Sequence, residues 1–287
     1  MGILTLENVS YVYSPSTPFE KEALHNVTLD FEEGKITGII GHTGSGKSTV
    51  AQLLNGLLKC TSGRVLFRSE DIFDKNNKVG DIRFHVGLVF QYPEYQLFEE
   101  TVYKDIAFGP TNMGLDEAEI NRRVIDAARF AGLDEELLSK SPFDLSGGQK
   151  RRAAIAGVMA MEPEVIVLDE PAAGLDPRGR DEILSGICTW QKEKGNTVII
   201  ISHSMEDMAR FSERLVVMSH GTVLIHDTVE EVFKKEDLIR ESGLALPQIT
   251  DVMNLLRKKG FPVKEGIYTV EEALCQILSL LKGNTNA

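Results

Sequence analysis

The chain contains the stretch Gly41-His42-Thr43-Gly44-Ser45-Gly46-Lys47-Ser48, which has the pattern G-x-x-x-x-G-K-[ST] of a P-loop and decides the fold. In a P-loop the glycines let successive backbone N–H groups turn inward around the α- and β-phosphates of a nucleotide. Lys47 would reach the β- and γ-phosphates, and Ser48 would place its hydroxyl on Mg²⁺. A helix that begins near Lys47 and includes Thr49 would add the positive end of its dipole. The sequence therefore predicts a nucleoside triphosphate site here.

The segments on either side of the P-loop have the pattern of a buried strand before it and a helix after it. Three further apolar runs of strand length follow, at residues 86–90, 165–168 and 197–201. Helical patterns separate these runs. Strands that are apolar on both faces and alternate with helices predict a largely parallel sheet covered on both sides. Functional residues should then lie at the carboxyl ends of the strands.

Other segments complete the predicted architecture. Residues 3–13 and 27–31 largely alternate apolar and polar residues, as half-buried antiparallel strands do, and 64–67 form another short strand. The pattern becomes helical from about Thr101 to Ala131, and we expect Pro110 and Gly114 to break the run. The sequence thus predicts an α/β P-loop NTPase with a mixed, largely parallel core sheet, an antiparallel β subdomain and a helical subdomain at about 92–160.

Polar residues stand at the ends of the buried strands, where a nucleotide hydrolase needs them. Asp169 closes one strand and is expected to hold Mg²⁺, while Glu170 beside it would orient or deprotonate the attacking water. His203 follows the next strand and would touch the γ-phosphate, and Gln91 would ligate Mg²⁺ or the water. Each of these residues alone is compatible with an ordinary polar strand end. The P-loop ahead of them favours the catalytic interpretation.

The segment Leu145-Ser146-Gly147-Gly148-Gln149 predicts a second anion site, because two glycines and a serine precede a helix. One triphosphate does not need two such sites in one chain. The simplest solution is a head-to-tail pair of subunits, in which each second site closes over the nucleotide held by the other P-loop.

Composition excludes several classes of protein. The 287 residues include 31 Lys and Arg against 43 Asp and Glu, and a net charge of −12 disfavours a protein that coats nucleic acid. Cys60, Cys188 and Cys275 have no metal-ligand spacing, which suits a reducing compartment. The longest apolar runs are too short to span a bilayer. We therefore expect any association with a membrane to depend on a partner.

Six motifs in this order resemble those of ATP-binding cassette (ABC) ATPases, over about residues 1–230. They are GHTGSGKS at 41–48 (Walker A), Gln91 (Q-loop), LSGGQ at 145–149 (signature), VIVLDE at 165–170 (Walker B), Gly174-Leu175-Asp176 (D-loop) and His203 (switch histidine). The resemblance implies that Tyr13 stacks on adenine, with its neighbour Tyr11 as the alternative. It also implies that Asp176 signals across the dimer. Ala172-Ala173 departs from many relatives without affecting a catalytic position.

The resemblance implies ATP and Mg²⁺ as cofactors and assigns the residues of the site. The catalytic residues would be Lys47, Gln91, Glu170 and His203, and the metal ligands would be Ser48, Gln91 and Asp169. The nucleotide-binding residues would be Tyr13, Gly41, His42, Thr43, Gly44, Ser45, Gly46, Lys47, Ser48, Thr49, Ser146, Gly147, Gly148, Gln149 and Asp176.

A narrower resemblance lies in residues 90–102 and 105–110, FQYPEYQLFEETV and DIAFGP, which look like the ATPase subunits of energy-coupling factor (ECF) transporters. It implies a motor for uptake of a vitamin or transition-metal ion, peripheral on the cytoplasmic face of the cell membrane. The implied partners are a related, non-identical cassette ATPase, a transmembrane T subunit and a substrate-binding S subunit, without nucleic acid. The alternatives are a conventional ABC importer and, less favoured, a soluble ABC ATPase acting on nucleic acid or ribosomes.

Residues after Gln91 are predicted to face the membrane subunits. Leu97 and Phe98 would offer apolar contact, and Glu94, Glu99 and Glu100 negative charge, to a short coupling helix that bears Arg or Lys. The alternative is an ordinary solvated acidic loop.

The chain is expected to divide into a nucleotide-binding domain at 1–234 and a small C-terminal extension at 235–287. Thr228-x-x-Glu231 and Thr269-x-x-Glu272 have the capping-box pattern of helix starts. An apolar stripe follows at helical spacing, formed by Leu274, Ile277, Leu278 and Leu281. The stripe would pack either against its own module or against the tail of the partner cassette.

Overall fold

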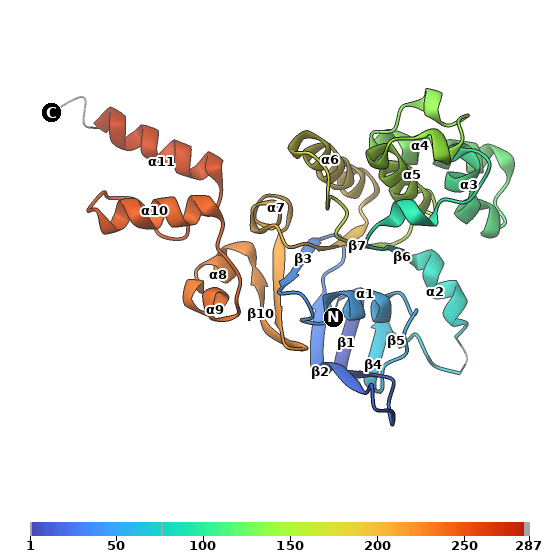
Figure 1. The fold of residues 1–287 in the computed structure, drawn as a ribbon, viewed down its shortest axis with the longest axis horizontal. Helices are drawn as coiled ribbons and strands as arrows, with labels where there is room; N and C mark the ends of the chain where they lie inside the picture. The colour runs from blue at the N-terminus through green and yellow to red at the C-terminus, as the bar shows by residue number, and fades with distance from the viewer. Residues whose placement is uncertain (1, 76, 284–287) are drawn as a thin grey trace.

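A six-stranded sheet forms the centre of the computed structural model, which describes residues 2–75 and 77–283 (Figure 1). The strand order is β10-β9-β3-β8-β7-β6, and all neighbours are parallel except the hairpin of β9 and β10. The strands are β3 (Ile36–Gly41), β6 (Val86–Val89), β7 (Val165–Asp169), β8 (Thr197–Ile201), β9 (Arg214–Ser219) and β10 (Thr222–Thr228). The predicted largely parallel sheet is confirmed, and the β9–β10 hairpin closes it on one side.

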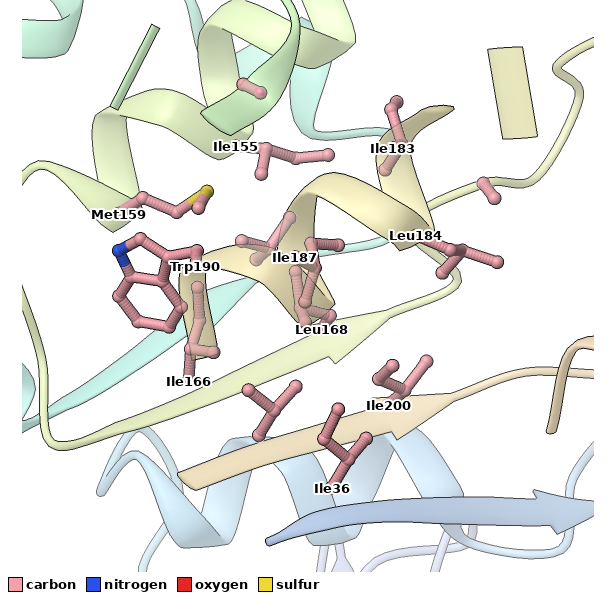
Figure 2. Close-up of a cluster of buried hydrophobic side chains, with 14 of the residues drawn as sticks. Ile36, Ile155, Met159, Ile166, Leu168, Ile183, Leu184, Ile187, Trp190 and Ile200 are labelled. Atoms are coloured by element: carbon pink, nitrogen blue, oxygen red, sulfur yellow. The ribbon is translucent and has the colours of Figure 1, made fainter. Parts of the chain in front are cut away.

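The central strands send alternate side chains into two hydrophobic cores, one on each face of the sheet. Ile166 and Leu168 of β7 pack with helices α5 (Gly147–Met159) and α6 (Pro177–Lys194), whereas Val165 and Val167 pack with α1 (Lys47–Leu54) on the other face. Figure 2 shows Trp190 of α6 in the first core, beside side chains of α5 and β7. Because both faces are covered, β7 and β8 are buried along their whole length.

A second sheet is antiparallel and has the order β2-β1-β4-β5. Its strands are β1 (Leu4–Tyr13), β2 (Lys21–Phe31), β4 (Ser62–Phe67) and β5 (Glu70–Asp71). The strand predicted at 27–31 begins six residues earlier, because Lys21 pairs with Tyr13 beyond shifts in register. The inner face of this sheet packs with α1 in the second core, and α2 (Val79–His85) leads from this region to β6.

The helical subdomain lies between β6 and β7 in the chain and projects to one side of the sheet (Figure 1). It contains α3 (Val102–Asn112), α4 (Glu117–Ala131), α5 and the short 3-10 turns η1 (Pro93–Gln96), η2 (Glu135–Leu137) and η3 (Pro142–Asp144). The predicted break at Pro110 is wrong, because Pro110 lies buried inside the last turn of α3. Thr111 Oγ1 donates to Ala107 O at 2.8 Å and supports the turn in which proline lacks an N–H. Gly114, with φ of 75°, follows the end of the helix.

Residues after β10 form helices α8 (Val229–Phe233), α9 (Glu236–Glu241), α10 (Gln248–Lys258) and α11 (Val270–Gly283). Ile239 and Leu246 join the first core, whereas α10 and α11 share a small separate core of Met253, Val263, Ile267 and Ala273. In α11, Ile277 packs on this small core, while Leu274, Leu278 and Leu281 are 54%, 45% and 62% exposed. Among the described residues, no helix combines the length and the apolar character needed to cross a bilayer.

Candidate active site

The P-loop connects β3 to α1, and its conformation depends on two glycines. Gly44 and Gly46 have φ of 81° and 103°, in the left-handed region that residues with a Cβ rarely adopt. Gly46 is also the N-cap of α1, so the unpaired N–H groups of the first helical turn lie at the loop. Lys47 Nζ donates to the carbonyl oxygens of Gly41 and His42 at 2.7 and 3.0 Å. Burial lowers the pKa of Lys47, while the nearby carboxylates oppose that change.

The turn between β9 and β10 supports the P-loop from the side. The N–H of Gly221 donates to Ser45 O at 3.1 Å, and the N–H of His25 donates to Gly221 O at 2.9 Å. The His220 N–H donates to His42 Nε2 at 3.4 Å, and the two imidazole rings are 4.7 Å apart. The sequence does not reveal this support, because a turn pattern does not say which distant segment the turn will contact.

A cavity of about 160 Å³ adjoins the P-loop and is lined by Tyr13, Lys21, Ala23, Gly44, Gly46, Lys47, Ser48 and Thr49. The hydroxyl oxygens of Tyr13 and Thr49 are 3.2 Å apart. Tyr11 packs toward the second core and meets the Tyr13 ring edge to face. Of the two tyrosines that the sequence leaves open, Tyr13 therefore lies at the cavity. Lys21 was missed by the sequence prediction, because it belongs to no motif.

The end of β7 brings two carboxyl groups beside the P-loop. Asp169 is the last residue of the strand, and Glu170 follows with φ of 54°, which is uncommon for a residue other than glycine. Burial raises the pKa of Asp169, while the Ser48 hydroxyl and the charge of Lys47 oppose the rise. Burial and the charge of Asp169 raise the pKa of Glu170 to about 7. The two carboxyl groups, Lys47 and Ser48 therefore share one site.

His203 approaches Glu170 from beyond the end of β8. Its Nε2 lies 3.0 Å from Glu170 Oε1, and the Glu170 side chain is buried. Burial and the charge of Lys47 lower the pKa of His203, which favours a neutral imidazole. A buried carboxyl group beside a neutral imidazole is suited to accept a proton from a bound water molecule.

Gln91 lies beyond β6 at the same edge of the sheet, since β6 and β7 are parallel neighbours with Val89 opposite Leu168. Amide, hydroxyl and carboxylate oxygens such as those of Gln91, Ser48 and Asp169 are the ligands that Mg²⁺ prefers. In the part of the chain that the structure describes, no three His, Cys, Asp or Glu side chains gather as a metal site. This donor set fits a Mg²⁺ that is held partly by nucleotide phosphates.

A second cavity, of about 380 Å³, opens beside Glu170 and His203 and is also lined by Arg180 and Asp207. Asp207 belongs to α7 (Met205–Phe211), and its Oδ2 lies 3.8 Å from Arg180 Nη1. Burial raises the pKa of Asp207. Neither Arg180 nor Asp207 stands in a motif, so the sequence offers no signal for their place beside the catalytic carboxylate.

The LSGGQ segment lies apart from both cavities, at the start of α5. Ser146 Oγ accepts from the Gln149 N–H at 3.3 Å, and Gln149 Oε1 accepts from the Ser146 N–H at 2.9 Å, which forms a capping box. A Cβ at Gly147 would meet nothing within 4 Å, so this end of the helix is open. Asp176 caps α6 by accepting from the Gly179 N–H at 2.7 Å. One chain alone therefore does not bring these residues to its own P-loop cavity.

The chain is similar to known proteins over nearly its whole length. The family model described as ABC transporter matches residues 24–173. The chain is 52% identical to the energy-coupling factor transporter ATP-binding protein EcfA2 of Clostridium perfringens, over 98% of this chain and 99% of that protein. It is 51% identical to the protein of the same name from Listeria monocytogenes, over 91% of each.

Two solved structures have the same fold. One is cbiO1 from Clostridium perfringens, described as part of the ABC transporter complex cbiONQ. It has a TM-score of 0.74 and 41% identity, over 88% of this chain and 99% of that one. The other is the ATP-binding cassette MJ0796, a dimer bound to ADP and Pi, with a TM-score of 0.71 and 29% identity, over 79% of this chain and 98% of that one.

Proposed function

The chain belongs to the ABC transporter family, and on this premise we propose that it is the ATP-hydrolysing motor subunit of an ECF-type membrane importer. One observation carries the proposal: the P-loop, Asp169, Glu170 and His203 meet at one edge of the sheet, while the LSGGQ segment faces outward elsewhere. The site for ATP at the P-loop would therefore be complete only when a second cassette supplies its signature segment.

Each residue of the site has a role that its surroundings support. The P-loop N–H groups and Lys47 bind the phosphates of ATP, and Tyr13 stacks on the adenine. Ser48, Asp169 and Gln91 would hold Mg²⁺, which would neutralise charge on the phosphates. Glu170 is the general base, because its carboxyl group is buried at the end of β7 and lies 3.0 Å from His203 Nε2. His203 orients the water and the γ-phosphate.

The second cassette is a related, non-identical chain in this proposal. A pair of cassettes is supported by MJ0796, which is described as dimeric, and the relatives are named energy-coupling factor transporter ATP-binding protein EcfA2. The nucleotide of the other cassette is contacted by residues at the starts of α5 and α6 of this chain, namely Ser146, Gly147, Gly148, Gln149 and Asp176. The exposed leucines of α11, within the extension at 235–287, support an added contact between the cassettes.

The membrane subunits dock on the helical subdomain. A groove of about 690 Å³ is lined there by Glu99, Tyr103, Lys104, Ala107, Phe108, Thr111, Glu117, Ile120 and Asn121. Phe98 and Phe108, 59% and 46% exposed, meet edge to face at 5.0 Å on this surface. Glu100 pairs with Lys104 and Glu94 with Arg151, so Glu99 is the carboxylate best placed to meet a basic coupling helix.

In this assembly the chain sits at the cytoplasmic face of the cell membrane, on a T subunit that also holds an S subunit. The S subunit selects a vitamin or a transition-metal ion, and this chain supplies only the energy.

The assembly can be tested by tagging the chain, extracting it from its native membranes in mild detergent and identifying its companions by mass. We expect a second cassette ATPase, one polytopic T-like protein and a small hydrophobic S-like protein. Recovery with a pair of conventional permease subunits would retain the transport motor and reject the ECF type. Recovery only from the soluble fraction, alone or with ribosomes or DNA, would overturn the membrane assignment.

A further inference from the structure

Arg151 lies two residues beyond the LSGGQ segment, on α5, and is enclosed by protein. Its side chain is 4% exposed. Nε and Nη2 donate to the two carboxylate oxygens of Glu94 at 3.1 and 2.9 Å, and Nη1 donates to the carbonyl oxygen of Ala173. The guanidinium also lies 5.9 Å from the centre of the Tyr92 ring. These contacts satisfy its planar donors on several sides.

The partners of Arg151 belong to two other functional segments. Tyr92 directly follows Gln91 and has φ of 59° at the start of η1, and Glu94 comes two residues later. Ala173 precedes Gly174-Leu175-Asp176. One guanidinium therefore connects the segment after Gln91, the helix that carries LSGGQ, and the segment that leads to Asp176.

Arginine suits this connection for geometric reasons. A planar guanidinium donates two parallel hydrogen bonds to one carboxylate and can still donate to a third acceptor, whereas a lysine ammonium fixes no such orientation. Because the pair is buried, separating Glu94 from Arg151 would leave a charge without a partner. Tyr92, Glu94 and Ala173 are thus expected to move together with the start of α5.

We propose that Arg151 is a positioning residue that couples the nucleotide held by this chain to the signature surface that the chain presents to its partner. The inference rests on the proposed function, in which Gln91 senses the chain's own γ-phosphate. In that function LSGGQ and Asp176 act on the other nucleotide. A shift of Gln91 is passed through Tyr92 and Glu94 to Arg151, and from there to α5 and Ala173. Each site then influences the other, as thermodynamic linkage requires of two coupled sites.

Hydrogen exchange of the full-length chain tests the coupling. Backbone amide exchange is measured at residues 146–150 and 173–176. The chain is saturated with Mg²⁺ and either ADP or a non-hydrolysable ATP analogue, so that the two samples differ in the γ-phosphate. In the unmodified chain we expect exchange to differ by about fivefold or more between the two nucleotides, in the range of known allosteric couplings. Arg151→Lys should bring this ratio to about one, while analogue affinity changes less than about twofold.

Two further variants separate positioning from stability. Arg123→Lys is the matched control, because Arg123 is also largely buried in the helical subdomain, pairs with Glu119 and donates to a carbonyl, that of Met161. The Arg123→Lys variant should show the same exchange ratio between the two nucleotides as the unmodified chain. Glu94→Gln replaces Arg151→Lys if the latter does not fold, since an amide retains one acceptor for the guanidinium.

The outcomes distinguish this inference from the proposed function. If the unmodified chain does not bind the analogue, the proposed function fails and the inference fails with it. If the analogue binds but the exchange ratio between the two nucleotides is about one in the unmodified chain, only the role of Arg151 is overturned. The same conclusion follows if the difference in exchange persists in both Arg151→Lys and Glu94→Gln. Loss of the ratio in Arg123→Lys as well would attribute the effect to general loosening of the subdomain and reject a specific role.

Discussion

The strand-end half-site (Gly41–Thr49, Asp169, Glu170 and His203) and the signature half-site (Ser146–Gln149) use their polar groups in opposite ways. In the strand-end half-site, the charged side chains of Lys47, Asp169 and Glu170 are buried, and Ser45 Oγ has no hydrogen-bond partner among the described residues. In the signature half-site, Ser146 and Gln149 satisfy each other through the capping box. Charge is buried at the first and absent from the second.

The difference follows from what each half-site would do. Proton transfer and stabilisation of developing charge need groups that are held away from water. Burial and the charge of Asp169 together raise the pKa of Glu170 to about 7. Recognition of a phosphate across an interface instead needs N–H groups that a second molecule can reach. The chain therefore combines a half-site with buried groups for chemistry and a half-site with accessible N–H groups for recognition.

The largest expected effect is on turnover at the strand-end half-site. Glu170→Gln removes the base but keeps its shape, so we expect ATP hydrolysis by the purified assembly to fall by about 10²- to 10⁴-fold. ATP binding, measured by equilibrium titration, should persist. Glu193→Gln, on the outer surface of α6, is the control and should hydrolyse normally. Substantial turnover without Glu170 would mean that another group prepares the water, and the comparison would lose its chemical half.

A smaller effect is expected on binding at the same half-site. Lys47→Met removes a charge from the phosphate site, and the loss of a charged hydrogen bond should weaken ATP binding by roughly 10- to 150-fold. Isothermal titration of the isolated chain measures this change. Lys35→Met, at an exposed lysine that precedes β3 and pairs with Glu213, serves as the control. Equal affinities for the two variants would contradict the placement of Lys47 against the phosphates.

The smallest effect is expected at the signature half-site. Ser146→Ala removes the helix cap and should lower the free energy of unfolding by about 1 kcal/mol, as measured by urea titration. It should leave ATP affinity of the isolated chain unchanged, because Ser146 does not line the cavity at the P-loop. A clear loss of affinity in the isolated chain would show that the two half-sites are not separate within one chain, and the comparison would break.

Local patterns predicted most of the fold and the strand-end residues. The apolar runs at 86–90, 165–168 and 197–201 became parallel strands, because such runs can be buried only in a covered sheet. Pro110 was misjudged, since its burial and the Thr111 hydrogen bond outweigh the preference of proline for breaking a helix. The pattern does not distinguish Tyr13 from Tyr11, whereas the fold places only Tyr13 of the two at the cavity.

Long-range contacts could not be predicted from one sequence. The support of Ser45 by Gly221, the pairing of Glu94 with Arg151, and the place of Lys21 at the cavity all join residues far apart in the chain. The prediction for Glu94 is wrong for this reason. Its carboxylate was expected to face a membrane subunit, but it accepts hydrogen bonds from the buried Arg151 of the same chain. Motifs identify the groups of a site but not the partners that hold them.

The chain has a single tryptophan, and its position makes that residue an intrinsic fluorescence probe. Trp190 is 1% exposed and lies in the first core beside Met159 of α5 and Ile166 of β7 (Figure 2). Indole emission shifts to longer wavelength when water reaches the ring, and here all of it originates from one place between the sheet and the helical subdomain. A motion that separates α5 from β7 and exposes Trp190 to water would therefore shift the tryptophan fluorescence of the protein, without an added label.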